Sequence, residues 1–190
     1  MRERLLAARR SVADDIRADE ARSLTAHLDA AVSSGSIVCA YVPVGDEPGS
    51  LEMLDALLRR AGRVLLPVAR TTADDSPVAL QWGEYRPGQL VAARFGLLEP
   101  AGPWLPATTL AEASVVLVPA LAVDRTGVRL GRGRGFYDRT LVHRDPRARL
   151  IAVIRDEELL EELPHEPHDV AMTHALTPGR GLIEVGGAAG

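Results

Sequence analysis

Short runs of apolar residues alternate along the chain with segments in which apolar residues recur every three or four positions. The short runs are typical of buried strands and lie at residues 36–42, 63–69, 115–118 and 150–154. The recurring pattern is typical of helices with one buried face and covers residues 3–32, 50–60 and 156–163. Further short strands are predicted at residues 78–82, 171–176 and 182–185. Ser11, with Asp14 three residues later, is a capping signal that predicts a break in the first helix.

Strands that alternate with helices predict an α/β fold. We expect a single domain over residues 1–190, with a mainly parallel sheet flanked by helices on both faces in a Rossmann-like three-layer arrangement. In such sheets, ligands bind in the crevice beyond the carboxyl ends of the strands. Two of the predicted strands end at Pro43 and Pro119, so the crevice is expected at the loops that follow these prolines.

Composition adds limits on partners and compartment. With 190 residues, 46% of them hydrophobic, the chain can form one domain with a substantial core. The formal charge of −4 argues against nucleic acid as the main partner. The apolar runs are far shorter than the roughly 20 residues of a membrane span, and no charged-then-apolar leader begins the chain. We therefore expect a cytoplasmic monomer without a membrane partner, in which the single cysteine, Cys39, is a small buried core residue.

Three glycines at alternate positions follow the apolar run at residues 115–118. Arg132 and Arg134 stand between Gly131, Gly133 and Gly135. Glycines let the backbone approach an anion closely, and arginines donate forked, charge-assisted hydrogen bonds to phosphate oxygens. A helix is predicted to begin directly afterwards, with its free N–H groups toward the same anion. The segment predicts phosphate binding, although a solvated loop or an RNA-contacting segment fits the glycines alone.

Two common nucleotide motifs do not match this loop. Phe136 stands where the dinucleotide fingerprint has its third glycine, and the Gly-Lys-Ser/Thr of a Walker A loop is absent. Asp138, just beyond the glycines, supplies a carboxylate of the kind that holds Mg²⁺ against phosphate oxygens.

The whole run GVRLGRGRGFYDR at residues 127–139 resembles the signature of the 5-formyltetrahydrofolate cyclo-ligase family, also called methenyltetrahydrofolate synthetases. Other stretches agree in the same order, YVPVGDEP at residues 41–48, FGLLEP at 95–100 and LPHEPHDV at 163–170, so the resemblance covers nearly all of the chain. It implies ATP- and Mg²⁺-dependent cyclisation of 5-formyltetrahydrofolate to 5,10-methenyltetrahydrofolate. ADP and phosphate are released, and the reaction proceeds through phosphorylation of the formyl oxygen.

The resemblance also implies roles for individual residues. Those assigned to the nucleotide are Arg2, Arg129, Leu130, Gly131, Arg132, Gly133, Arg134, Gly135, Phe136 and Tyr137. Those assigned to the folate substrate are Val42, Glu47, Arg132, Gly133, Arg134, Gly135 and Phe136. A carboxylate such as Glu47 offers two acceptors to the N–H donors of a pterin. Asp138 and Asp169 are implied as Mg²⁺ ligands, and Arg134 and Tyr137 as catalytic residues.

Several positions depart from the family pattern. The family has a lysine four residues before the ATP-contacting arginine that corresponds to Arg2, and here that position would precede Met1. Arg134 stands where many relatives carry lysine, and Phe136 replaces a frequent tyrosine. Val123 and Thr173 replace a phenylalanine and an acid. These departures favour, as an alternative, a non-catalytic relative that binds nucleotide or folate.

The histidines and the aromatic residues raise two further points, a zinc site and ring stacking on the substrate. His165, His168 and His174 lack the spacing of established zinc sites, so we expect a helper or loop role for them. Aromatic residues gather in the middle of the chain, where they either stack on a flat pterin or cover an edge of the core: Trp82, Tyr85, Phe95 and Trp104.

Overall fold

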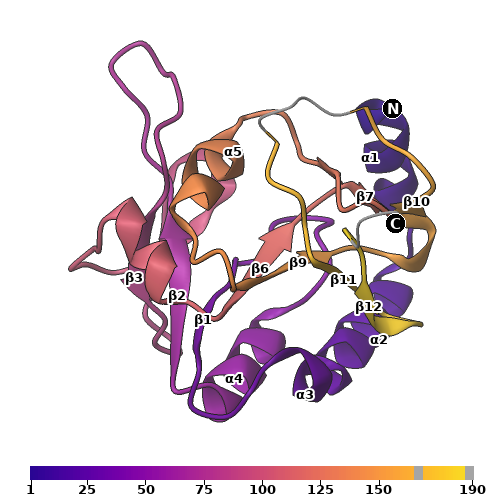
Figure 1. The fold of residues 1–190 in the computed structure, drawn as a ribbon, viewed down its shortest axis with the longest axis horizontal. Helices are drawn as coiled ribbons and strands as arrows, with labels where there is room; N and C mark the ends of the chain where they lie inside the picture. Colours follow the sequence, from indigo (N-terminus) through magenta and orange to yellow (C-terminus); the bar gives the residue numbers. More distant parts are fainter. Residues whose placement is uncertain (165–168, 187–190) are drawn as a thin grey trace.

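A computed structural model describes residues 1–164 and 169–186. Within these residues the main sheet has seven strands in the order β12-β11-β9-β6-β1-β2-β3 (Figure 1). The inner strands, from β11 to β2, are all parallel, and both edge strands are antiparallel to their neighbours. The bounds are β1 Ile37–Cys39, β2 Arg63–Val68, β3 Gln81–Glu84, β6 Val115–Pro119, β9 Arg149–Val153, β11 His174–Thr177 and β12 Gly181–Glu184. The predicted α/β class with a mainly parallel sheet is confirmed.

Successive residues of the inner strands pack on opposite faces of the sheet, as the two-residue period of a strand requires. On one face, Val64 and Leu117 join a core with Leu54 of a helix. The helices of that face lie together below the sheet in Figure 1 and are α2 (Asp14–Ala26), α3 (Leu28–Ala31) and α4 (Leu51–Arg60). On the other face, Val116 packs with Leu110. Short helices supply that layer, namely η2 (Ala107–Glu112), α5 (Phe136–Thr140) and η3 (Leu141–His143).

Helix α4 shows how sequence produces one of these layers. The Ser50 side chain accepts a hydrogen bond from the Met53 N–H at 3.3 Å, which satisfies one of the free donors at the helix start. Met53, Leu54 and Leu57 are fully buried and lie on one face at helical spacing. The observed bounds differ from the predicted residues 50–60 only by the capping serine.

The first helical segment is interrupted where the sequence predicts a break. Helix α1 covers Arg2–Arg10, and α2 starts only at Asp14. Ser11 acts differently from the capping signal, because its hydroxyl donates to the Ala8 carbonyl at 2.7 Å and so closes α1. No helix in the described part of the chain is long and apolar enough to cross a bilayer.

A small sheet beside the main one carries the approach to the glycine loop. It runs in the order β10-β7-β8, from Leu159–Leu160, Ala122–Asp124 and Arg129–Leu130. Buried Asp124 organises the turn between β7 and β8, because its carboxylate accepts from the N–H groups of Thr126, Val128 and Leu163 at 2.8–3.0 Å. Gly127 has φ +88°, and a Cβ there would lie 2.3 Å from the Met172 carbonyl oxygen, so only glycine fits.

Some local predictions are wrong in detail. The expected helix at residues 156–163 is a single turn, η4 (Asp156–Glu158), followed by β10, because Glu158 turns inward to a buried partner. The strand expected at residues 78–82 is β3 at Gln81–Glu84. A hairpin of β4 (Leu90–Ala92) and β5 (Leu98–Pro100), with η1 (Arg94–Gly96) at its tip, was not expected as regular structure. Cys39 is fully buried in the core, as expected.

Candidate functional site

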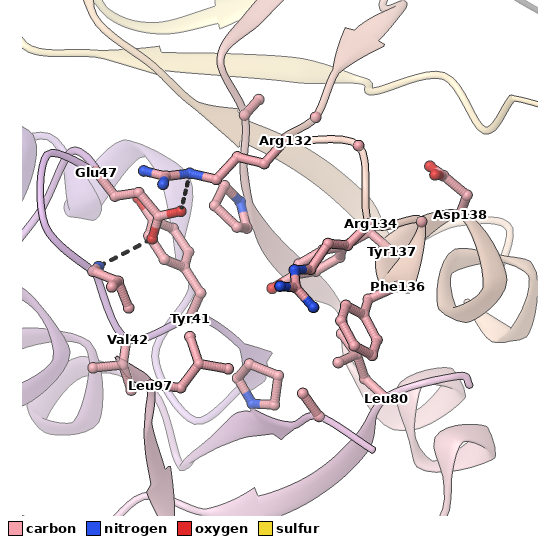
Figure 2. A pocket seen from close by; sticks show the side chains of 18 of the residues that line it. Tyr41, Val42, Glu47, Leu80, Leu97, Arg132, Arg134, Phe136, Tyr137 and Asp138 are labelled. Carbon is pink, nitrogen blue, oxygen red and sulfur yellow. Dashed lines mark hydrogen bonds and ion pairs between the residues drawn. The ribbon is translucent and has the colours of Figure 1, made fainter. Parts of the chain in front are cut away.

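A cavity of about 340 Å³ lies at the carboxyl ends of β1, β2 and β6, where the crevice is expected. The loops after β1 and β2, the hairpin and the glycine loop form its walls (Figure 2). Of the predicted site residues, the following line it: Val42, Glu47, Arg129, Gly131, Arg132, Gly133, Arg134, Gly135, Phe136, Tyr137 and Asp138. Val42 and Glu47, predicted for the folate, therefore share one space with the glycine loop, which follows more than 80 residues later in the sequence.

Three predicted residues lie outside that lining. Arg2 reaches the glycine loop from helix α1 and donates from Nε to the Gly131 carbonyl oxygen at 3.0 Å. Leu130 packs into a small apolar cluster with Leu5. Asp169 is exposed, beyond the cavity. His165 and His168 fall outside the described residues, whereas His174 begins β11 beside Thr173.

The glycine loop joins β8 to the short helix α5. Gly133 and Gly135 have φ of +94° and +74°, a left-handed conformation that other residues rarely adopt. Buried Thr140 fixes the helix at its far end, because its hydroxyl donates to the Phe136 carbonyl and accepts from the Leu80 N–H at 2.8 Å. The loop therefore has a defined path along one wall of the cavity.

Arg129, Tyr137 and Asp138 form a corner of that wall. The Arg129 guanidinium pairs with the Asp138 carboxylate and lies 5.7 Å from the centre of the Tyr137 ring. Burial lowers the pKa of Arg129, and the carboxylates of Asp138 and Asp169 act against this shift. Within the described residues, Arg129 Nε, Arg129 Nη1 and Tyr137 Oη are buried and make no hydrogen bond. Buried donors without partners are costly, so these atoms point to an acceptor that a ligand would supply.

Glu47 lies on the opposite side of the cavity (Figure 2). Its Oε2 accepts from the Val44 N–H at 3.0 Å, and its Oε1 lies 3.0 Å from Arg132 Nε. Burial raises the pKa of Glu47, whereas Arg132 lowers it. The Tyr41 hydroxyl donates to the Pro48 carbonyl oxygen at 2.5 Å and holds the same loop from below. This wall thus presents a largely buried carboxylate in a fixed orientation.

The two acids predicted for Mg²⁺ both act on Arg129, Asp138 as its ion-pair partner and Asp169 through its charge. Both are close enough to raise its pKa, although 31 residues separate Asp138 from Asp169 in sequence. The Asp138 side chain is 47% exposed and lines the cavity. No group of three or more His, Cys, Asp or Glu residues within the described ranges is arranged to hold a metal. Mg²⁺ takes as few as one or two carboxylates together with phosphate and water, and Asp138 supplies one such carboxylate at the cavity.

The sequence did not reveal several residues that shape the cavity. Leu97 and Leu98 line it from the unexpected hairpin. Glu99 holds that hairpin against the end of β2, because its buried carboxylate accepts from the Ala69 N–H at 2.7 Å and pairs with Arg70 at 2.9 Å. The FGLLEP motif, in which Glu99 stands, was the available signal.

Trp82, Tyr85 and Trp104 of the middle segment do not line this cavity. Trp82 and Tyr85 are buried in the core clusters, and Trp104 stacks on Arg70 at 4.3 Å. The rings in the cavity lining belong to Tyr41, Phe136 and Tyr137. The Phe95 side chain lies outside the described part of the structure.

Fold and cavity together define an α/β protein with a candidate ligand cavity at the carboxyl edge of its parallel sheet, beside a loop rich in glycine and arginine. The chain belongs to the 5-formyltetrahydrofolate cyclo-ligase family, whose family model matches residues 1–178. It is 62% identical over 183 residues to the 5-formyltetrahydrofolate cyclo-ligase of Mycolicibacterium smegmatis, covering 96% of this chain and 94% of that one. Identity to the Escherichia coli K12 protein of the same name is 30% over 145 residues, or 75% and 78% of the two chains.

Solved structures agree with the fold. The structure of Aquifex aeolicus 5,10-methenyltetrahydrofolate synthetase superposes with a TM-score of 0.76 at 21% identity, over 96% of this chain and 90% of that one. The 5,10-methenyltetrahydrofolate synthetase of Mycoplasma pneumoniae superposes with a TM-score of 0.67 at 15% identity, over 90% and 92%. At these identities the likeness concerns the fold alone.

Proposed function

We propose that the chain is a 5-formyltetrahydrofolate cyclo-ligase that converts its substrate to 5,10-methenyltetrahydrofolate at the expense of ATP. One observation carries the proposal. A single cavity is lined on one wall by Arg129 and Tyr137, whose buried donors make no hydrogen bond to the residues that the structure describes, and on the other by the largely buried Glu47 carboxylate. The first set suits phosphate oxygens and the second suits the N–H donors of a pterin.

The chemistry needs both molecules in one place. The formyl oxygen on N5 is a poor leaving group until it accepts the γ-phosphoryl group of ATP, with departure of ADP. N10 then attacks the formyl carbon and loses its proton, and phosphate departs with the former formyl oxygen. Phosphoryl transfer of this kind depends on positioning and charge neutralisation more than on covalent help from the protein.

The nucleotide side of the site is assigned to the glycine loop. Arg129 offers Nε and Nη1 to phosphate oxygens, and the backbone from Gly131 to Gly135 provides close approach for the anion. Arg2 supports the loop through its hydrogen bond to Gly131 and adds a positive charge nearby. The predicted nucleotide set is completed by Leu130, Phe136 and Tyr137. Phe136 and Tyr137 line the cavity, whereas Leu130 packs in the apolar cluster with Leu5 and supports the loop.

The folate side is assigned to the loop after β1 and to the inner edge of the glycine loop. Glu47 would bind the pterin N–H groups, and Val42 supplies an apolar surface beside it. Residues 132–136 border the same space, and Figure 2 shows Phe136 on the wall across from Val42. A flat ring system fits between such apolar surfaces, with its polar edge toward the carboxylate.

Arg134 and Tyr137 are the proposed catalytic residues. Arg134 comes from the loop and, in Figure 2, points into the cavity, where its charge would stabilise the transferring phosphoryl group. Burial raises the pKa of Tyr137, with a further contribution from Glu47, so its hydroxyl stays protonated at neutral pH. Tyr137 therefore acts as a hydrogen-bond donor and not as a base.

Asp138 and Asp169 are the residues that would hold a magnesium ion, with Asp138 at the cavity wall. When bound, the ion supplies charge neutralisation for the phosphate oxygens. Arg129 is already paired with Asp138 and feels the charge of Asp169, so both acids act on the same corner of the site.

The remaining expectations concern partners. The departures from the family pattern raised the alternative of a non-catalytic binder, but a relative named as the enzyme is 62% identical over nearly the whole chain, which favours the enzyme. We propose that the protein works as a monomer in the cytoplasm. Light scattering of the purified protein tests the first of these points.

The direct test is turnover. Purified protein mixed with 5-formyltetrahydrofolate, ATP and Mg²⁺ should build the long-wavelength absorbance of the methenyl product, with one ADP released for each product formed. Reactions without ATP or with the Tyr137→Phe variant serve as controls. Folded protein that produces no absorbance change, but binds ATP or the folate tightly, supports the non-catalytic alternative instead.

A further inference from the structure

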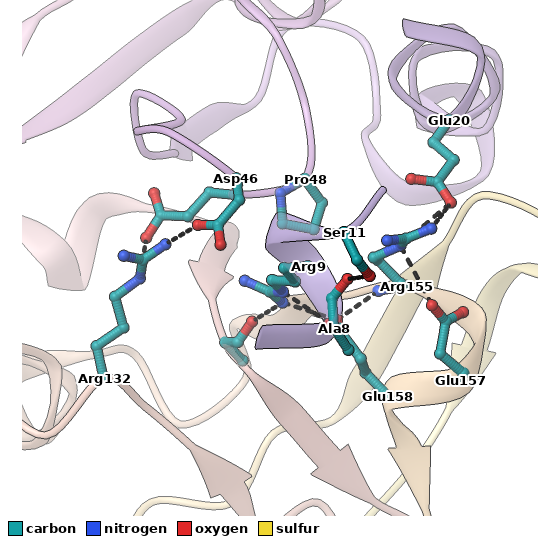
Figure 3. Close-up of polar contacts among 12 residues, drawn as sticks. Ala8, Arg9, Ser11, Glu20, Asp46, Pro48, Arg132, Arg155, Glu157 and Glu158 are labelled. Atoms are coloured by element: carbon teal, nitrogen blue, oxygen red, sulfur yellow. Dashed lines mark hydrogen bonds and ion pairs between the residues drawn. The ribbon is translucent and has the colours of Figure 1, made fainter. Parts of the chain in front are cut away.

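Arg132 bridges two neighbouring acids of the opposite loop (Figure 3). Its Nη2 donates to Asp46 Oδ1 at 2.8 Å, and its Nε lies 3.0 Å from Glu47 Oε1. The Asp46 and Glu47 side chains are only 13% and 12% exposed. One guanidinium therefore neutralises two adjacent, largely buried carboxylates and ties the glycine loop to the loop after β1.

Asp46 and Glu47 differ in what they face. Glu47 lines both the main cavity and a smaller neighbouring cavity of about 200 Å³, whereas Asp46 lines only the smaller one. A ligand in the main cavity therefore meets Glu47 and Arg132 but not Asp46. Among the described hydrogen bonds, Asp46 reaches the site through the Arg132 guanidinium; burial raises the pKa of the neighbouring Glu47, and the charge of Asp46 also raises it.

The contact with Asp46 fixes the orientation of the Arg132 guanidinium. The Arg132 side chain is 42% exposed and has several rotatable bonds, so one carboxylate alone leaves its orientation free to vary. With Nη2 held by Asp46, the Nε edge is directed at Glu47 Oε1. Glu47 Oε2 is fixed separately by the Val44 N–H. Both oxygens of the Glu47 carboxylate are thus held in place. The Val44 N–H holds Oε2, and Arg132, which Asp46 orients, holds Oε1.

We infer that Asp46 is a positioning residue for the folate side of the site, which orients the Glu47 carboxylate through Arg132. This inference rests on the proposed function, in which Glu47 binds the pterin. It assigns Asp46 no contact with substrate or nucleotide. Its loss should therefore weaken folate binding while the chemical step, once the substrate is bound, is little changed.

Steady-state kinetics of Asp46→Ala test whether folate binding weakens while the chemical step is preserved. The KM for 5-formyltetrahydrofolate should rise about tenfold, with kcat and the KM for ATP within about twofold of wild type. Asp46→Glu keeps the charge and should recover most of the loss. Asp29→Ala is the matched control, because Asp29 also pairs with an arginine, Arg60, but far from the site. Melting temperatures identify any variant that fails to fold, in which case Asp46→Asn replaces Asp46→Ala.

A double-mutant cycle with Arg132→Gln separates positioning from any other role. If Asp46 acts through Arg132, Asp46→Ala should change the KM for the folate by less than about twofold in the Arg132→Gln background. An equal fold-change in both backgrounds overturns the inference and leaves the proposed function intact. If the wild-type chain binds the folate without converting it, the same cycle is read from dissociation constants. A folded wild-type chain that neither binds nor converts the folate overturns both.

Discussion

Arg9 and Glu158 form a doubly hydrogen-bonded pair across 149 residues of sequence, with Arg9 Nε and Nη2 each 2.7 Å from a different carboxylate oxygen (Figure 3). Both side chains are almost completely buried. Arg9 Nη2 also donates to the Ala120 carbonyl oxygen at 2.5 Å, and Ala120 lines the main cavity. The pair therefore joins helix α1 and η4 to the floor of the proposed site.

We predict that Arg9→Met destabilises the protein severely. The substitution leaves the Glu158 carboxylate buried without its partner, which costs about 3–5 kcal/mol and should lower the melting temperature by roughly 10 °C. Exposed Arg10→Met is the control and should change little. The double variant Arg9→Met with Glu158→Gln should lose less than the sum of the single losses. Calorimetry that finds Arg9→Met as stable as wild type contradicts the assignment.

Gly127→Ala should be more damaging than an alanine elsewhere in the glycine-rich segment. The left-handed φ of Gly127 and the 2.3 Å approach of the Met172 carbonyl oxygen leave no room for a methyl group. Gly131 has open space around its Cβ position and no such φ, so Gly131→Ala is the matched control. We expect a fall in melting temperature of several degrees for the first variant and almost none for the second. Equal melting temperatures count against the turn geometry described above.

Arg129→Lys should weaken nucleotide binding selectively. Lysine keeps the charge but loses the guanidinium fork, and with it the buried donors Nε and Nη1, which make no hydrogen bond to the residues that the structure describes. We expect the KM for ATP to rise about tenfold or more, with a much smaller change in the KM for the folate. Arg147→Lys, on a 91% exposed side chain, provides a control for the exchange itself. A variant whose KM for ATP equals that of wild type excludes Arg129 from the nucleotide site.

The pH dependence of kcat/KM for the folate should follow the ionisation of the Glu47 carboxyl group. Burial raises the pKa of this carboxyl above its ordinary value, and only the ionised form accepts two pterin N–H donors. Folate affinity is therefore complete above the raised pKa and is lost as pH falls through it. We expect kcat/KM for the folate to decline on the acid side at a pH above about 4.3, the ordinary value for glutamate. In Glu47→Gln this decline should disappear, together with most of the affinity. A decline that persists unchanged in the variant must come from another group.

Asp138→Asn should reduce turnover strongly while the fold survives. Asp138 is nearly half exposed, so its amide replacement costs little packing, but the largely buried Arg129 loses the negative charge of its partner, so melting temperatures are measured alongside the kinetics. Loss of the proposed Mg²⁺ ligand should lower kcat/KM for Mg²⁺-ATP by about 10- to 100-fold and raise the Mg²⁺ concentration needed for half-maximal rate. Asp145→Asn, at a partly exposed acid that pairs with Arg147, is the control. Unchanged magnesium dependence in Asp138→Asn contradicts the metal assignment.

Much of the fold follows directly from the apolar pattern. The runs around Val38, Val64, Val116 and Ile151 became inner strands of the sheet, because buried parallel strands are apolar on both faces. The shortest strands could not be predicted from the apolar pattern. The strands of the hairpin and the small sheet are two or three residues long, too short to show a period. The predicted helix after Asp156 failed because Glu158 is drawn into the core by Arg9, a partner that no local pattern reveals.

The candidate site likewise has residues that the sequence reveals and residues that it does not. The glycine loop and Glu47 are contiguous motifs, and the structure brings them to one cavity. Asp46 could not be recognised, since its partner Arg132 lies 86 residues away and its own position looks like an ordinary loop acid. The hairpin residues Leu97 and Leu98 were missed for a similar reason, because only the Glu99 contacts bring them to the cavity.

The central claim is that the formyl oxygen receives the γ-phosphoryl group of ATP within the cavity between Glu47 and the glycine loop. The measurement that tests it most directly is the fate of that oxygen. With ¹⁸O in the formyl group of 5-formyltetrahydrofolate, each turnover should deliver the label to the released inorganic phosphate, as read by mass spectrometry. Phosphate that carries no label while the methenyl product accumulates contradicts the account.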